Sequence, residues 1–146
     1  MNTDLPSAPD LPSAPQLLSD EALAFVTDRH LATLSTMSPD GRIHVVAVGF
    51  SYRDGIARVI TGGGSRKVAN ILADGRASLS QVEGPRWLTL QGTATIATSP
   101  EEVQFGVDLY SLRYRAPRVN PERVVIVMQV EKVMGSSGMK RLLHKD

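Results

Sequence analysis

The spacing of hydrophobic and polar residues along the chain predicts three short helices and six strands. Apolar positions three or four residues apart predict helices over residues 19–29, 65–74 and 99–116. Serine stands at the N-cap position of each helix, and Ser99-Pro100-Glu101-Glu102 adds a capping box with proline at the first helical position. Shorter alternating or continuous apolar runs predict strands over residues 30–37, 42–52, 56–61, 76–82, 86–96 and 124–133.

Two of the predicted strands are apolar on both faces. Residues 45–48 and 124–128 are apolar without interruption, whereas a strand with one face in water alternates. Hairpin turns such as Asp54-Gly55 join most strands, which favours a small closed or nearly closed antiparallel barrel. One apolar face of each strand then needs a further cover, and a homodimer interface is the simplest one.

The other strands and the last helix predict which side chains face inward. Alternation over residues 76–82 places Gln81 on the same face as Ala77 and Leu79, opposite Val82. The next strand separates Trp87 from Leu88 and Leu90 in the same way. In the last helix one face carries Val103, Val107, Tyr110 and Tyr114. We therefore assign these tyrosines to packing rather than catalysis.

Composition narrows the function classes. A chain of 146 residues with 42% hydrophobic content forms one small domain, and a net charge of +1 disfavours a nucleic-acid partner. There is no cysteine, and three scattered histidines have no metal-ligand spacing. The chain also lacks a signal-peptide pattern and an apolar run of membrane-spanning length. A cytoplasmic protein without a metal or a membrane partner is expected.

The two ends of the chain differ in composition from its middle. Residues 4–15 are the hexapeptide DLPSAP written twice, which is rich in proline and poor in large apolar residues. We interpret residues 1–17 as a disordered tail and residues 18–134 as the folded domain. Residues 135–146 then form a flexible basic tail.

The strongest candidate for ligand chemistry is the turn after the third strand. Three glycines, residues 62–64, precede Ser65, Arg66 and Lys67 at the start of a helix. Glycine backbone, free N–H groups of a helix start and two cations together suit a phosphate group. However, neither common phosphate-binding fingerprint is present. The local pattern fits a flexible turn with solvated charges equally well.

Four arginines cluster around the end of the third helix. They are Arg113, Arg115, Arg118 and Arg123. Cations at a helix C-terminus complement the helix dipole, and this interpretation is favoured. The alternative is a basic rim for the anionic tail of a ligand.

Three stretches carry a resemblance to a known family. HVVAVGF, ARVITGGGSRKVANILADGRASLSQV and RWLTLQGTATI resemble the split-barrel family of flavin and deazaflavin oxidoreductases related to pyridoxamine 5′-phosphate oxidase. The resemblance covers residues 19–134. HVVAVGF and SQVEGPRWL look most like the branch of biliverdin reductases that use coenzyme F420.

The resemblance implies a mainly β fold with short helices, namely a six-stranded antiparallel split β-barrel that forms a homodimer with cofactor clefts between the subunits. The cofactor phosphate would lie on Ser65, Arg66 and Lys67. The ring would lie along the second strand and the end of the third, with two side chains at the cleft wall. These residues are His44, Val45, Val46, Ala47, Val48, Ile60, Thr61, Gln81 and Trp87. On its own, Trp87 suits a barrel core equally well, and His44 is more often a solvent-facing or hydrogen-bonded core residue.

The implied function is hydride transfer from reduced coenzyme F420 to a conjugated acceptor, with the linear tetrapyrrole biliverdin as the expected one. No residue stands out as an obligatory acid or base, and solvent can protonate the acceptor, so no catalytic residue is assigned. Two alternatives are an FMN-dependent oxidase or reductase of the same fold, and a non-enzymatic carrier of F420 or a tetrapyrrole. An oligonucleotide-binding barrel is disfavoured because aromatic residues make up only 5% of the chain.

Overall fold

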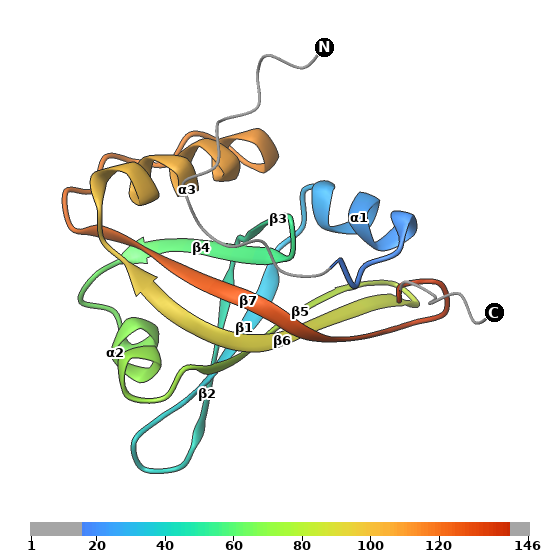
Figure 1. The fold of residues 1–146 in the computed structure, drawn as a ribbon, viewed down its shortest axis with the longest axis horizontal. Coiled ribbons are helices and arrows are strands. Elements are labelled where there is room, and N and C mark those ends of the chain that lie inside the picture. The colour runs from blue at the N-terminus through green and yellow to red at the C-terminus, as the bar shows by residue number, and fades with distance from the viewer. Residues whose placement is uncertain (1–15, 141–146) are drawn as a thin grey trace.

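The computed structural model describes residues 16–140, which form one antiparallel sheet and three short helices (Figure 1). The strands are β1 Ala32–Met37, β2 Ile43–Val48, β3 Ser51–Arg53, β4 Ile56–Gly62, β5 Arg76–Glu83, β6 Arg86–Ala97 and β7 Arg123–Gly135. The helices are α1 Asp20–Thr27, α2 Arg66–Ala73 and α3 Pro100–Arg113. Spatial order in the sheet is β2-β1-β5-β6-β7-β4-β3. The predicted mainly β class with short helices is confirmed.

The prediction of six strands was wrong by one, because residues 42–52 form two strands instead of one. β2 and β3 are separated by Gly49 and Phe50, and they are the two edge strands of the sheet. A Cβ at Gly49 would come within 3.0 Å of the Tyr114 ring, so a ring from α3 occupies the space beside the break. The sheet is curled, and its two edge strands are linked by only two residues. No hydrogen-bonded ladder joins these two strands. The sheet is therefore not a closed barrel.

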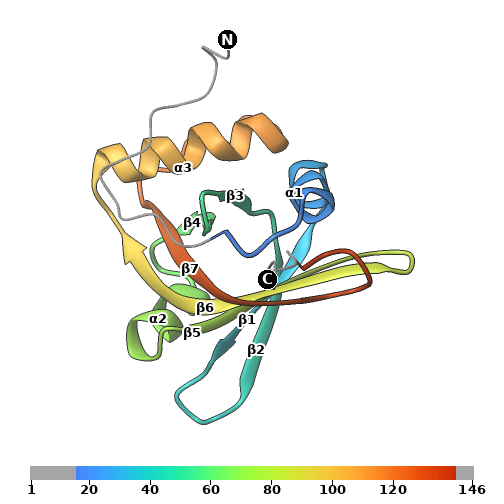
Figure 2. The same ribbon diagram turned by 45° about the vertical axis from the view of Figure 1, so that its right-hand side comes forward.

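The main core lies on the concave face of this curled sheet. Figures 1 and 2 show the β1–β2 and β5–β6 hairpins projecting in different directions from the centre, where the core forms. Leu34, Leu79 and Leu90 pair in register across β1, β5 and β6, and all three are buried. Ala77, Leu79 and Gln81 are buried as the alternation predicted, and Trp87 is exposed on the opposite face.

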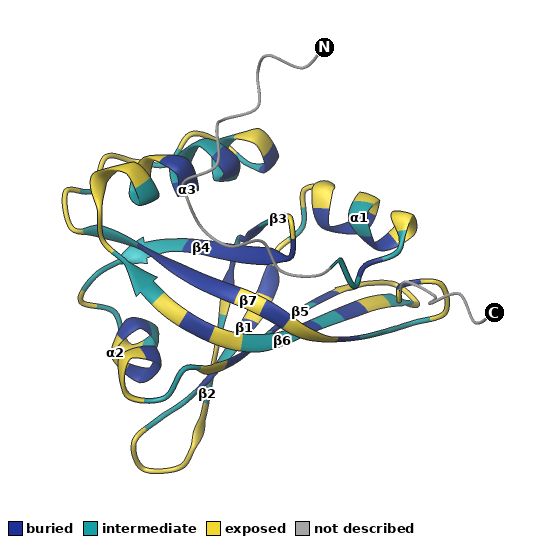
Figure 3. Cartoon of the chain, in the orientation of Figure 1, coloured by how far each residue is buried: buried dark blue, intermediate teal, exposed yellow. Residues whose placement is uncertain are grey.

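β7 shows that an apolar second face can be covered by the same chain. Ile126 and Met128 point into the main core, whereas Val125 and Val127 form a second cluster with Ile56. α3 lies over this second cluster, across β4 and β7 (Figures 1 and 3). For this strand the expected need for a further cover is corrected, because its own helix supplies one.

The buried face of α3 also differs from the predicted one. Phe105, Leu109 and Arg113 are its buried large side chains, four residues apart. Val103, Val107, Tyr110 and Tyr114 are only partly buried, since they lie beside that stripe.

All three predicted serines stand at the N-cap positions of their helices, and two of them make a side-chain capping hydrogen bond. The Ser19 hydroxyl accepts from the Ala22 N–H, and the Ser99 hydroxyl accepts from the Glu102 N–H. Ser65 stands at the N-cap position of α2 but makes no side-chain capping bond.

The first and last described stretches of the chain meet on one side of the fold. Leu18 bridges Lys140, and Leu18 and Met139 are buried. The stretch of the predicted basic tail up to residue 140 therefore packs against the domain. The repeated hexapeptide and residues 141–146 lie outside the described residues.

Candidate functional site

A pocket lies where the end of β2 meets the end of β4. Its volume is about 240 Å³, and it is enclosed by three parts of the chain: these two strand ends, the first turn of α2, and the segment from the last turn of α3 to the start of β7. The lining residues are Ala47, Val48, Gly49, Ile60, Thr61, Gly62, Lys67, Tyr110, Pro117, Asn120 and Arg123. One side of the pocket is therefore apolar and the other carries cations.

The cationic side is formed by Lys67 and Arg123. Burial lowers the pKa of the Lys67 ammonium below its usual range, since removal from water disfavours the charged form. The Arg123 guanidinium donates to the Arg118 carbonyl. Among the described residues no ion pair joins either cation to a carboxylate, and the lining contains no acidic side chain. The pocket is thus suited to an anion.

The glycine turn brings the start of α2 to this pocket. The Gly63 N–H donates to the Glu122 carbonyl at 2.8 Å, and a Cβ at Gly63 would lie only 3.1 Å from the same oxygen. None of the three glycines has positive φ, so close packing against residue 122 explains Gly63 better than backbone freedom does. The Ser65 Oγ is buried without a hydrogen-bond partner. An orphaned hydroxyl at the N-cap of a helix, whose first turn carries a cation without a carboxylate partner, fits a phosphate group.

The aromatic wall of the pocket is Tyr110. Its ring stacks on the Tyr114 ring at a centroid distance of 4.7 Å. The Tyr114 hydroxyl donates to the His30 carbonyl at 2.6 Å and accepts from the Phe50 N–H at 3.2 Å. Tyr114 is therefore the fixed member of the pair, and it positions Tyr110 at the pocket.

Comparison with known proteins identifies the family. The family model described as pyridoxamine 5'-phosphate oxidase matches residues 18–136. The chain belongs to this family. A curated relative, the F420H(2)-dependent biliverdin reductase of Mycobacterium tuberculosis, is 51% identical over 124 residues, which cover 84% of this chain and 90% of the relative.

Solved structures share the fold at lower identity. A conserved hypothetical protein from Mycobacterium tuberculosis has a TM-score of 0.72 at 23% identity, covering 88% of this chain and 89% of that one. A protein described as an F420 reductase has a TM-score of 0.65 at 22% identity, with 76% of this chain and 94% of that one covered.

Five residues that the family resemblance implied as cofactor contacts meet at the pocket. They are Ala47, Val48, Ile60, Thr61 and Lys67. Ser65 and Arg66 stand beside it at the start of α2, where Arg66 is exposed. His44, Val45 and Val46 continue along β2 away from the pocket.

The two residues predicted for the cleft wall, Gln81 and Trp87, do not line this pocket. Gln81 is fully buried in the core, where its amide donates to the Phe25 carbonyl and accepts from Arg113. It is not among the residues that line this pocket. Trp87 stands at the β5–β6 hairpin, on the exposed face of the sheet.

The arginine cluster separates into different roles. Arg113 is buried and donates to the carbonyls of Asp28 and Phe50 and to the Gln81 side chain, at 2.6–2.7 Å. This arginine joins α3 to the sheet and is not part of a rim. Arg115 and Arg118 are exposed, and Arg123 is the member that lines the pocket. Sequence analysis missed Tyr110, Pro117 and Asn120 as lining residues.

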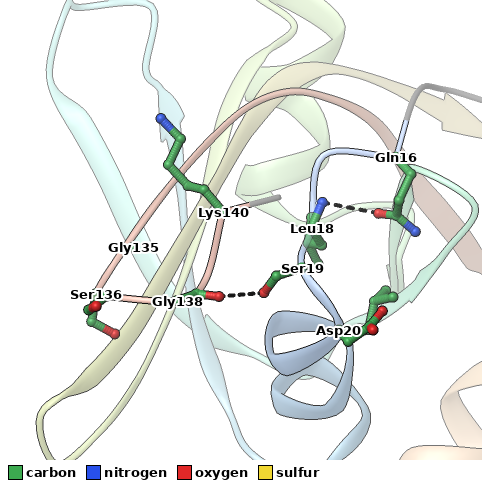
Figure 4. Close-up of a pocket in the computed structure, with 10 residues that line it drawn as sticks. Gln16, Leu18, Ser19, Asp20, Gly135, Ser136, Gly138 and Lys140 are labelled. Carbon is green, nitrogen blue, oxygen red and sulfur yellow. Dashed lines mark hydrogen bonds between the residues drawn. The ribbon is translucent and has the colours of Figure 1, made fainter. Parts of the chain in front are cut away.

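Two larger cavities contain none of the proposed cofactor contacts. One, of about 1030 Å³, lies between the start of α1 and the turn after β7, where the Ser19 hydroxyl donates to the Gly138 carbonyl (Figure 4). The other, of about 460 Å³, lies on the exposed face of β1, β5 and β6 and includes Ser35 and Gln91.

Neither a metal site nor a membrane-spanning helix is found in the part of the chain that the structure describes. No group of three or more histidine or acidic side chains could hold a metal ion there. No helix within residues 16–140 has the length and apolar character needed to cross a membrane.

Proposed function

We propose that this protein is a reductase that uses reduced coenzyme F420 to transfer a hydride to biliverdin or a similar conjugated tetrapyrrole. The observation that carries the proposal is the anion pocket of Lys67 and Arg123 beside an apolar strand edge. The relative that shares 51% identity over 84% of this chain is described as having this activity.

Different residues around the pocket would bind the phosphate and the ring of such a cofactor. Lys67, Arg66 and the Ser65 hydroxyl would hold its phosphate, with Arg123 as an additional cation. β2 is an edge strand, so one side of its backbone is unpaired and can hydrogen-bond a flat ring along residues 44–48. When bound, the deazaflavin supplies the hydride, and the chain supplies orientation and an apolar surface.

No residue of the pocket lining stands out as an obligatory acid or base for the reaction. Its lining contains neither a histidine nor a carboxylate, and Lys67 and Arg123 are needed for charge. We therefore assign the proton that accompanies the hydride to solvent at the open side of the site, and we name no catalytic residue.

The open face of the sheet supports a homodimer. Large apolar side chains are exposed on this face, on strands that lie side by side as β2-β1-β5-β6. They are Ile43, Val45, Val82 and Trp87. A second copy of the chain would cover them. A cleft-wall role for Trp87 requires this second copy, because within one chain Trp87 is far along the β5–β6 hairpin.

The decisive experiment is oxidation of reduced F420 by the purified protein in the presence of biliverdin, with quinones and nitroaromatics as alternative acceptors. Acceptor-dependent oxidation with biliverdin supports the proposal. Tight FMN binding without a response to F420 would show a flavin enzyme instead. Tight F420 binding without turnover on any acceptor would show a carrier.

Direct titration tests the phosphate assignment. Lys67→Ala should weaken F420 binding by about 1.5–3 kcal/mol, as expected for loss of a hydrogen bond to a charged group. Lys140→Ala, an exposed lysine that lies beside α1 and outside the pocket, is the matched control and should bind as the wild type does. Equal affinities for all three proteins would remove Lys67 from the site.

A cytoplasmic location of the protein stays a prediction.

A further inference from the structure

Helix α2 carries the proposed phosphate ligands but has little to hold it in one orientation. It has eight residues, and a helix this short does not form by itself in water. Val68 and Ile71 are buried and hold it against the sheet by apolar contact. Such contact is non-directional, so it leaves the rotation of the helix about its own axis weakly defined.

Asn70 provides the missing directional contact. It is fully buried, and its Nδ2 donates to the Thr36 Oγ1 of β1 at 3.0 Å. Thr36 is buried as well. This side-chain hydrogen bond joins α2 (residues 66–73) directly to β1 of the sheet. Buried hydrogen bonds have narrow geometric limits, so this one restricts the helix to one rotation.

We propose that Asn70 is a positioning residue for the phosphate site: by donating to Thr36 it fixes the rotation of α2 and so directs Lys67 and the first-turn N–H groups into the pocket. Lys67 precedes Asn70 by three residues, about one helical turn. A rotation that broke the Asn70 contact would therefore turn Lys67 by the same angle. The inference rests on the proposed phosphate-binding role of α2.

The surroundings of Asn70 indicate that the contact serves geometry more than stability. Its Oδ1 is buried without a partner, and so is the Nδ1 of His44, which lies opposite Thr36 in the β1–β2 register. Two orphaned polar atoms beside one hydrogen bond lower the net stability that the cluster provides. Replacing both partners by apolar side chains of similar shape is then expected to leave the fold nearly as stable.

The test compares a ligand that reaches the phosphate site with one that does not. Wild type, the double variant Asn70→Leu/Thr36→Val, and Thr36→Ser, which keeps the hydroxyl, are titrated by fluorescence. The ligands are F420 and the same deazaflavin without its phosphate-bearing chain. The double variant should lose about tenfold in affinity for F420, the size of one well-placed hydrogen bond to a charged group, and less than about twofold for the phosphate-free ligand. Thr36→Ser should match the wild type with both.

Each other outcome overturns the inference in a recognisable way. An equal loss with both ligands, or a lower urea midpoint of unfolding, would show that Asn70 only maintains the fold. Unchanged affinity for both ligands would show that α2 keeps its orientation without Asn70. If the wild type binds both ligands with the same affinity, the phosphate assignment itself fails, and the inference fails with it.

Discussion

β2 and β7 have the same kind of sequence but different surroundings. Both contain an uninterrupted apolar run, and both place one face against the main core. The second face of β7, with Val125 and Val127, is buried under α3. On β2 the second face is open: Ile43 is 68% exposed and Val45 is 54% exposed.

The difference shows what an apolar run does and does not specify. Such a run indicates that burial of both faces of the strand is favourable, because the free energy of burial follows the apolar area removed from solvent. It does not indicate which helix, strand or partner chain buries the second face. For β7 the cover is a helix of the same chain, and for β2 we propose a second copy. Four substitutions separate the two cases, from the largest expected effect on stability to the smallest.

Val125→Asp should abolish folding or destabilise it by more than about 4 kcal/mol, since it buries an unpaired carboxylate under α3. Val125 is completely inaccessible to solvent. Circular dichroism during denaturant titration would measure the loss. A midpoint equal to that of the wild type would mean that α3 does not cover this face in solution.

Arg113→Met should destabilise the protein by about 3 kcal/mol, because it removes the hydrogen bonds that join the end of α3 to the sheet. The carbonyls of Asp28 and Phe50 and the Gln81 side chain would lose their donor. Arg115→Met, at the exposed neighbour, is the control and should change stability by less than about 0.5 kcal/mol. Similar unfolding curves for both variants would contradict this role.

Ser99→Ala tests the other end of the same helix and should cost about 1 kcal/mol, the usual value of an N-cap hydroxyl. The Ser99 hydroxyl accepts from the Glu102 N–H at 3.2 Å. Thr98→Ala, one residue earlier and outside the helix, serves as the control. Urea unfolding of the pair measures the difference, and no difference would show that the start of α3 is held by packing alone.

Val45→Asp should change the stability of one chain by less than about 0.5 kcal/mol, because the side chain is already in water. Its effect is expected on assembly: light scattering should report the mass of a dimer for the wild type and of a monomer for the variant. Leu72→Asp is the control, since Leu72 is 71% exposed on α2, away from this face, and should leave the mass unchanged. A monomeric wild type would remove the proposed partner.

Local signals predicted most of the secondary structure. The caps at Ser19 and Ser99 fixed two helix starts, and strict alternation gave the faces of β5 and β6. The break between β2 and β3 could not be found in this way. Gly49 at this break packs against a pair of tyrosine rings about sixty residues later in the chain, a contact that no local pattern reveals.

In the candidate site, too, some residues could be predicted from the sequence and others could not. Lys67 was proposed from the glycine turn and the helix start that follows it, whereas Ala47, Val48, Ile60 and Thr61 were proposed only through the family resemblance. Tyr110 and Asn120 were missed, since they reach the pocket only when α3 and the segment after it fold back beside β4. The helical spacing of Tyr110 and Tyr114 was noticed, but spacing alone cannot separate a packing ring from a pocket wall.

The short link between β2 and β3 has a consequence for ligand binding. Gly49 and Phe50 connect the two edges of an open sheet, and Gly49 lines the pocket together with Ala47 and Val48 directly before it. A ligand there contacts β2 on one side and β4, the neighbour of β3, on the other. A bound ligand therefore bridges the gap between the two edges of the sheet, which no backbone hydrogen bonds connect. A ligand that binds only the folded protein also stabilises it: at a concentration one hundred times its Kd it adds about 2.7 kcal/mol to the free energy of unfolding. Amide hydrogen exchange should slow most along this gap when the pocket is filled.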